Sequence, residues 1–135
     1  MKKGKIRVLL IEPTEHPKTF FIEPTMQSFK KLVGADKRKH SGIEAKRLEK
    51  NLYVVFNKDR FLSNLKANRR IGDDILIGTI IVVAINDEKC PVSLTDDQLS
   101  KYALRFWNTE FFDDMDIVEA NLNTLFARFL KDEEL

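Results

Sequence analysis

The sequence predicts an α+β domain with a mixed or mostly antiparallel sheet of about five strands, helices on one face, and a C-terminal helical extension. Three observations support this class. Short runs rich in β-branched and aromatic residues are separated by turn signals, which is typical of strands. Two later segments place apolar residues at helical spacing after capping residues. The chain has 135 residues, of which 43% are hydrophobic and 33% charged, and this composition suits one folded domain.

The N-terminal part predicts a hairpin followed by a short helix. Residues 5–12 are apolar at most positions of both faces, which indicates a buried strand. The two prolines within 13–17 indicate a turn, so residues 19–22 are expected to pair with the first strand. Thr25 is a suitable N-cap for a helix that ends at Gly34, because threonine accepts an orphan backbone N–H and glycine tolerates the left-handed conformation.

The middle of the chain predicts three more strands and one long loop. Residues 43–48 and 52–56 are expected to be strands joined by a turn at 49–51. The polar, basic segment 57–70, NKDRFLSNLKANRR, is far longer than a hairpin needs, and long connections in compact domains are usually functional. The β-branched run 75–85 then predicts a single strand in the middle of the sheet.

The last part predicts two helices. In LTDDQLSKYALRFW, Thr95 and Gln98 form a capping box. A longer amphipathic helix is expected from Asp113, so the chain divides into a core at 1–112 and a helix at 113–135. Its candidate partner face consists of Val118, Leu122, Leu125, Phe126 and Phe129, with Met115 at the N-terminal end. An apolar stripe of this kind is unfavourable in water, so it should pack either on the core or on a second copy of the chain.

The long loop carries a candidate binding site at Asn68, Arg69 and Arg70. Amide and guanidinium groups are donors suited to carbonyl, carboxylate or phosphate oxygens. The structural alternative is that Asn68 caps the loop while Arg69 pairs with Asp73 or Asp74.

A second candidate surface is a basic patch, which comprises Lys37, Arg38, Lys39, Lys46 and Arg47. Together with the cations of 58–70, the segment 37–50 could face the phosphates of a nucleic acid. The net charge of +2 and the lack of aromatic residues between the lysines favour an ordinary solvated surface instead. The charge is uneven: residues 110–135 hold eight acidic and two basic residues, so the rest of the chain is basic.

Enzyme chemistry finds little support in the sequence, which predicts no catalytic residues, no metal site and no cofactor. His16 and His40 lie in separate loops without other ligands at metal-binding spacing, and the five glycines form no phosphate loop. The single cysteine, Cys90, excludes an internal disulfide, is expected to be buried or inert, and suits a reducing compartment. The longest apolar run is too short to cross a bilayer, so a cytoplasmic protein without membrane contact is expected.

Several short motifs occur in an order that resembles a known family. These motifs are VLLIEP, KKLVG, YVVFN, the loop ending in ANRR, DILIGTIIVVA and SLTDDQLSKYALRF. They are similar to the family of domain of unknown function 3846, small proteins of Gram-positive bacteria, their phages and mobile elements. The likeness covers residues 5–112 and implies a cytosolic α+β domain, but it brings no catalytic residues to carry over.

Some features of this chain differ from the family pattern. Ala35 stands where members have glycine, and the basic stretch 36–41 intervenes before the next strand. Asn68 and Arg69 stand at the family's Asn-Arg position, and the helix from Asp113 is an addition. The expected function is therefore that of a small non-enzymatic binding protein of phage or mobile-element type. Its expected partner is a host or defence protein, or a second copy of itself; a nucleic-acid-binding accessory role is the alternative.

Overall fold

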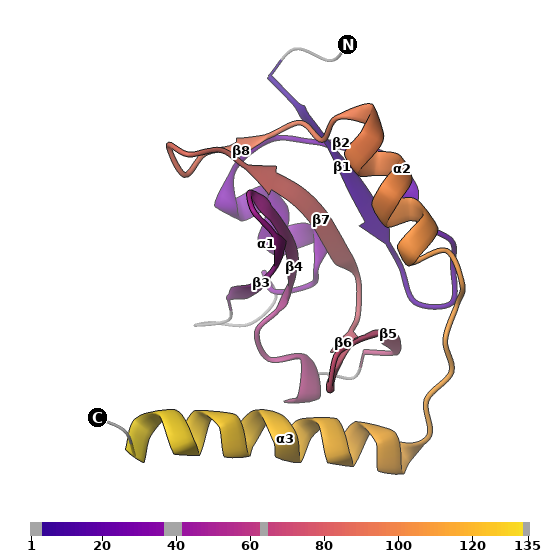
Figure 1. Cartoon of the computed structure of the whole chain (residues 1–135), viewed down its shortest axis with the longest axis vertical. Coiled ribbons are helices and arrows are strands. Elements are labelled where there is room, and N and C mark those ends of the chain that lie inside the picture. Colours follow the sequence, from indigo (N-terminus) through magenta and orange to yellow (C-terminus); the bar gives the residue numbers. More distant parts are fainter. Residues whose placement is uncertain (1–3, 37–41, 63–64, 134–135) are drawn as a thin grey trace.

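The computed structural model describes residues 4–36, 42–62 and 65–133 (Figure 1). Its elements are β1 (Ile6–Ile11), β2 (Lys18–Ile22), α1 (Met26–Leu32), β3 (Ile43–Glu49), β4 (Leu52–Asn57), the 3-10 helix η1 (Arg60–Leu62), β5 (Ala67–Ile71), β6 (Asp74–Ile77), β7 (Ile80–Ile85), β8 (Pro91–Val92), α2 (Asp96–Arg105) and α3 (Asp114–Glu133). The predicted α+β class, with its C-terminal helix, is confirmed.

The main sheet has the strand order β2-β1-β7-β4-β3, and β8 pairs with the end of β7. All pairings between the described strands are antiparallel. The predicted hairpin of the first two strands is present, with Val8 opposite Phe20. The central strand β7 is buried along almost its whole length, as its β-branched sequence predicts.

The helices lie on both faces of this sheet, so the prediction that they cover one face is wrong. Leu9 and Ile11 of β1 belong to the core cluster that contains Tyr102 and Phe106 of the α2 region. Val8 and Leu10 point to the other face and join Phe29 of α1. Strands β1, β4 and β7 have buried apolar residues at consecutive positions. Successive side chains of a strand point to opposite faces, so both faces of the sheet must be covered by other elements.

The segments 57–70 and 75–85 depart most from their predictions. The expected loop contains η1 and strand β5, and the expected single strand is divided into β6 and β7. The division occurs at Gly78, which adopts a φ of +81°, a conformation that favours glycine. Strands β5 and β6 therefore form a separate two-stranded sheet.

Helix α2 is attached through its ends and its inner face. Thr95 and Gln98 form the predicted capping box. Near the C-terminal end, the Tyr102 hydroxyl donates to Glu49 Oε1 at 2.8 Å, and Lys101 Nζ donates to the same oxygen at 3.1 Å. The hydrogen bond from Tyr102, followed by that from Lys101, lowers the pKa of the Glu49 carboxyl. Burial, followed by the hydrogen bond to Glu49, raises the pKa of Tyr102.

Helix α3 lies along one side of the molecule, beyond the small β5–β6 sheet (Figure 1). It packs on β6, where Ala120 joins Ile75 and Ile77 in a third apolar cluster. The intervening residue Leu76 belongs to the main core instead. The small sheet is therefore a spacer between the main core and α3.

Candidate functional site

Asn68 and Arg69, the predicted binding pair, lie in the interior of the protein with no exposed surface. The Asn68 side-chain amide donates to the carbonyl oxygens of Ile11, at 2.9 Å, and Gly78, at 2.8 Å. Asn68 therefore joins the end of β1 to the point where β6 and β7 separate.

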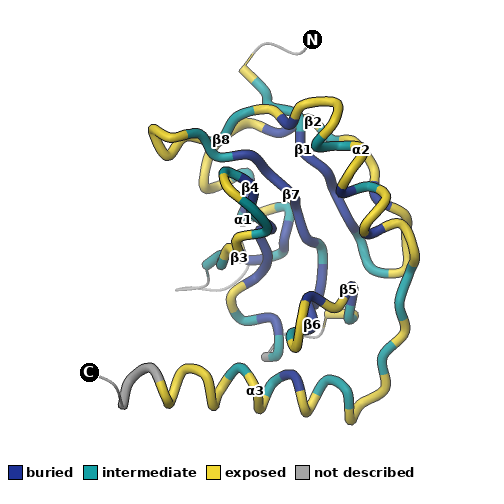
Figure 2. Tube along the Cα trace, in the orientation of Figure 1, coloured by how far each residue is buried: buried dark blue, intermediate teal, exposed yellow. Residues whose placement is uncertain are grey.

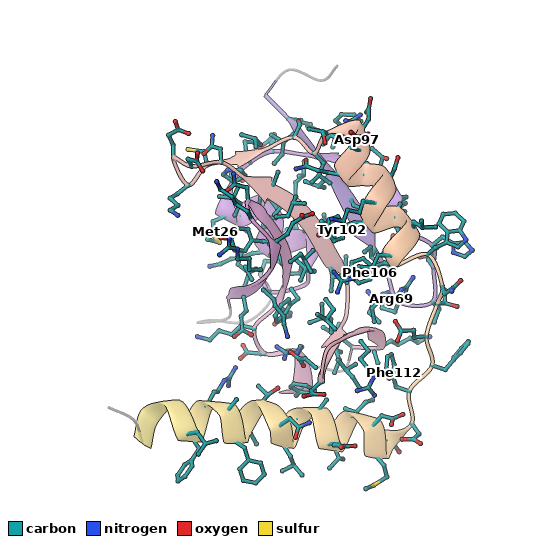
Figure 3. The ribbon with its side chains drawn as sticks, viewed as in Figure 1. Met26, Arg69, Asp97, Tyr102, Phe106 and Phe112 are labelled. Atoms are coloured by element: carbon teal, nitrogen blue, oxygen red, sulfur yellow. The ribbon has the colours of Figure 1, made fainter. Side chains whose placement is uncertain are left out.

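The Arg69 guanidinium is held by four oxygen atoms. Its Nε donates to the carbonyl oxygen of Phe106 at 3.0 Å, and Nη2 donates to that of Glu15 at 2.7 Å. Its Nη1 donates to the Oδ1 atom of Asn68 at 2.9 Å and to the carbonyl oxygen of the same residue at 3.3 Å. Figure 3 shows Arg69 beside Phe106, at the end of α2. Burial lowers the pKa of Arg69, although an arginine remains charged at ordinary pH.

These contacts contradict two interpretations of Asn68 and Arg69: that they form a binding pair, and that Arg69 pairs with Asp73 or Asp74. Donors that are already bonded to backbone oxygens in the interior are not available to a partner, so Asn68 and Arg69 have a structural role. The alternative partner predicted for Arg69, Asp73 or Asp74, is also wrong. Only Arg70 of the three candidates is exposed; its guanidinium lies 5.6 Å from the centre of the Phe112 ring and 4.0 Å from a carboxylate oxygen of Asp116.

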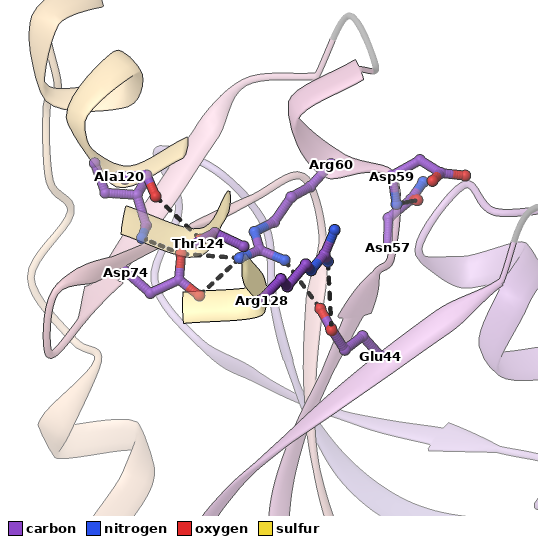
Figure 4. Close-up of polar contacts among 9 residues, drawn as sticks. Glu44, Asn57, Asp59, Arg60, Asp74, Ala120, Thr124 and Arg128 are labelled. Carbon is purple, nitrogen blue, oxygen red and sulfur yellow. Dashed lines mark hydrogen bonds and ion pairs between the residues drawn. The ribbon is translucent and has the colours of Figure 1, made fainter. Parts of the chain in front are cut away.

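The carboxylate of Asp74 binds a different buried arginine, which the sequence reasoning missed. Arg60 Nη2 donates to the two carboxylate oxygens of Asp74 at 2.9 and 2.7 Å, and Nη1 donates to Glu44 at 3.2 Å (Figure 4). The guanidinium carbon also lies 4.7 Å from the ring centres of both Phe56 and Phe61. The signal in the sequence was an arginine next to one phenylalanine and four residues after another, a spacing that allows stacking.

A cleft of about 510 Å³ opens beside Arg60, between β3, β6 and α3. Arg128 of α3 reaches across it and lies 3.8 Å from Glu44, which already accepts from Arg60. Lys46 and Asp73 also line the cleft. Positive and negative side chains are interleaved here, and ion pairs join Arg60 to Glu44 and Asp74, and Arg128 to Glu44.

The two sides of α3 differ in the size of their side chains. The side that faces the small sheet carries Ile117, Ala120 and Thr124, of which only Ala120 is fully buried. At about 100° per residue, the predicted partner face lies on the opposite side of the helix. Figure 2 shows this outer side as exposed along the helix.

All members of the predicted partner face are exposed, and the exposed set extends at both ends. It comprises Met115, Val118, Leu122, Leu125, Phe126, Phe129 and Leu130. Phe126 retains 61% of its possible exposure and Met115 retains 71%. Fully burying one large apolar side chain is worth about 1.5–3 kcal/mol, so this outward apolar face is a substantial driving force for association. Of the two alternatives for the stripe, packing on the protein's own core is wrong.

The predicted basic patch is only partly within the described residues. Lys37, Arg38 and Lys39 lie outside them. Lys46 and Arg47 are neighbours on β3, where successive side chains point to opposite faces, and Lys46 faces the cleft with the acidic residues. In the loop, Arg60 and Arg69 are buried. Arg60 and Arg69 therefore contribute no charge to the surface, and Lys46 and Arg47 point to opposite faces of β3.

Metal-binding clusters and membrane-spanning helices are both absent from the described residues. Their His, Cys, Asp and Glu side chains include no group of three or more placed to hold a metal ion. None of the described helices combines the length and apolar character that a membrane span requires.

A family model matches most of the chain. The family model described as Domain of unknown function (DUF3846) matches residues 6–106, which span β1 to the end of α2. Helix α3 lies outside the matched residues. Neither a curated protein nor a solved structure matches the chain.

Proposed function

The chain belongs to the DUF3846 family, and from this premise we propose that it is a small non-enzymatic binding protein that acts through protein–protein contacts made by the outward face of α3. The observation that carries the proposal is the orientation of this helix. Ile117, Ala120 and Thr124 face the protein, and the seven large apolar side chains of the outward face are exposed. Such contiguous apolar surface is characteristic of interaction sites.

The interior supports a binding role without a catalytic step. The two buried arginines are Arg60 and Arg69, which are held by carboxylates and by carbonyl and amide oxygens respectively. These groups stabilise the position of the β5–β6 hairpin, and the hairpin supports α3. Polar interior groups thus position the binding face and do not take part in it.

The proposed setting is the cytoplasm of a bacterium, with a phage or mobile element as the source. The proposed target is a component of the host cell or of its defence machinery. Support for this setting comes from the short motifs of the sequence, which resemble small proteins of Gram-positive bacteria, their phages and mobile elements. The binding of nucleic acid through 37–50 and 58–70 is the alternative function.

The proposal is tested by capture from the lysate of a Gram-positive bacterium, with and without nuclease. The wild type is compared with the double variant Leu122→Glu, Phe126→Glu, and with the control Leu104→Glu. Leu104 is 78% exposed on α2, away from α3, so the control introduces the same substitution on another surface. We expect wild type and control to retain the same host protein and the double variant to lose it.

A direct measurement follows on the captured protein after its purification. Hydrogen exchange should slow in residues 115–130 when the partner is added, because the outward face becomes covered. Equal capture by all three proteins would contradict the proposal. Capture that disappears after nuclease treatment would favour the nucleic-acid alternative.

A further inference from the structure

We infer that the outward face of α3 binds a second copy of the same chain, as an antiparallel helix pair. The inference rests on the proposed function, because it concerns the same face, for which a second copy and a host component would compete. It follows from the spacing of the apolar residues, the distribution of charge along the helix, and the position of the helix on the molecule.

The spacing of the apolar residues is that of a helix pair. Met115, Val118, Leu122, Leu125 and Phe129 follow one another at intervals of three, four, three and four residues. This is the heptad pattern by which two helices form a continuous seam. All five residues are exposed.

The same spacing is self-complementary when the two helices run in opposite directions. With the two-fold axis crossing the helix between residues 123 and 124, Leu122 lies opposite the partner's Leu125. Val118 then lies opposite the partner's Phe129. Each of these pairs combines a residue from the N-terminal half of one helix with a residue from the C-terminal half of the other. The apolar seam is therefore continuous from Val118 to Phe129 in both copies.

The charge on α3 favours this direction over the parallel one. The first part of the helix region carries Asp113, Asp114, Asp116 and Glu119, with no basic residue before Arg128. A parallel pair would place these four carboxylates beside the same four of the partner, which is unfavourable. An antiparallel pair instead keeps the two sets of carboxylates at opposite ends of the seam.

The position of α3 leaves room for the second copy. The sheets and the other two helices all lie on one side of α3, and the apolar face points away from them (Figures 1 and 2). A two-fold axis across the outer side of α3 therefore places the two bodies on opposite sides of the helix pair. The inner side, with Ile117 and Ala120, keeps its contacts within each copy.

Sedimentation of the purified full chain over a wide concentration series is the first test. We expect a dimer for the wild type and for the control Leu104→Glu. Leu122→Glu should raise the dissociation constant at least about tenfold, because each dimer acquires two buried carboxylates. Circular dichroism serves to confirm that the variant retains its fold. A wild type that is monomeric throughout the series overturns the inference.

Disulfide trapping tests the direction of the helices and does not depend on a disruptive variant. In a Cys90→Ser background, one protein carries Leu122→Cys and another carries Leu125→Cys. The antiparallel pair predicts disulfides mainly between the two different proteins when they are mixed and oxidised. Disulfides that form mainly within each single variant indicate a parallel pair and overturn the inference. Unsubstituted wild type, in which Cys90 is exposed on the turn before β8, controls for non-specific oxidation.

The two proposals fail in different ways. If the chain is monomeric but Leu122→Glu, Phe126→Glu abolishes capture of a host protein, the dimer is wrong and the binding function stands. If the dimer forms and the lysate yields no partner that depends on α3, the dimer stands and the host target is wrong.

Discussion

Helices α2 and α3 show that the amount of apolar surface on a helix does not decide whether the helix belongs to the core. Helix α3 has 20 residues and seven exposed large apolar side chains, yet among its described side chains only Ala120 is fully buried. Helix α2 has 10 residues, and it directs Tyr102 and the adjoining Phe106 into the main cluster. What differs is which side of the helix faces the sheet.

The two helices also differ in their polar attachments. The α2 region receives a hydrogen bond from a fully buried arginine, Arg69, and its Tyr102 donates to Glu49 on β3. The described polar contacts that α3 makes with the body are the longer ion pairs of Arg128 with Glu44, at 3.8 Å, and of Asp116 with Arg70, at 4.0 Å. Exposed pairs of this kind contribute little, so α3 should separate from the body more easily than α2.

The largest effect is expected from Tyr102→Ala. This substitution leaves a cavity in the main cluster and removes a donor to Glu49, and it should lower the free energy of unfolding by about 3–5 kcal/mol. Urea denaturation measures the change. Leu104→Ala in the same helix is the control and should cost less than about 0.5 kcal/mol, because this side chain is exposed.

The next effect concerns the buried arginine that holds the α2 region. Arg69→Ala removes the donors to the carbonyl oxygens of Glu15 and Phe106, and should cost about 2–4 kcal/mol. The neighbouring Arg70→Ala is the control, with an expected cost below about 1 kcal/mol, because Arg70 is exposed. Equal effects of the two substitutions in thermal or urea unfolding would show that Arg69 is no more structural than its neighbour.

A smaller effect is expected where α3 meets the β5–β6 hairpin. Ala120→Leu overfills the contact with Ile75 and Ile77, and should cost about 1–3 kcal/mol. Hydrogen exchange should accelerate in α3 while β4 and β7 remain protected, because the contact is local. The control is Ala127→Leu, at an exposed position of the same helix. Loss of protection throughout the main sheet would mean that α3 belongs to the same cooperative unit as α2.

The smallest effect is a dependence of stability on pH. The pKa of Glu49 is lower in the folded protein than in the unfolded chain, so its charged form stabilises the fold above the unfolded pKa. This contribution is lost as the pH falls through the folded pKa. We expect Glu49→Gln to be less stable than wild type near neutral pH, and the difference to shrink in acid. Urea unfolding at a series of pH values measures it.

The variant Tyr102→Phe separates the two donors to Glu49. The hydroxyl of Tyr102 makes the largest contribution to the lowered pKa, so its removal should weaken the acid dependence. The pKa of Tyr102 is raised, and the neutral hydroxyl therefore stabilises the fold up to its ordinary pKa, a contribution that is lost as the pH rises through the folded value. A variant that keeps the full acid dependence would assign the effect to Lys101 instead.

Much of the local structure could be predicted from the sequence. The cap at Thr25, the capping box at Thr95 and the first hairpin are all where the residue patterns place them. The long loop and the strand at 75–85 could not be predicted in the same way. Gly78 looks like an ordinary strand glycine until the structure shows that Asn68 binds its carbonyl oxygen from ten positions earlier in the chain.

The residues of the candidate site also differ in whether the sequence could predict their role. The apolar face of α3 could be recognised from its spacing, but Arg69 and Arg60 have the same exposed-loop appearance in the sequence as Arg70. Their burial follows from contacts with the turn after β1, with β3 and with the end of α2, segments that are distant along the chain. A resemblance in motif order located Asn68 and Arg69 as notable residues without indicating that their role is structural.

The sequence by itself determined most of the elements, the caps at Thr25 and Thr95, and the amphipathic character of both C-terminal helices. These features depend on interactions within about four residues, which any reader of the sequence can evaluate. Only the tertiary structure decided that α1 and α2 cover opposite faces, that two loop arginines are buried, and that α3 turns its large side chains outward. The reason is that burial depends on how well two surfaces fit together. The small sheet, with Ile75 and Ile77, packs more closely against Ala120 than it could against a phenylalanine.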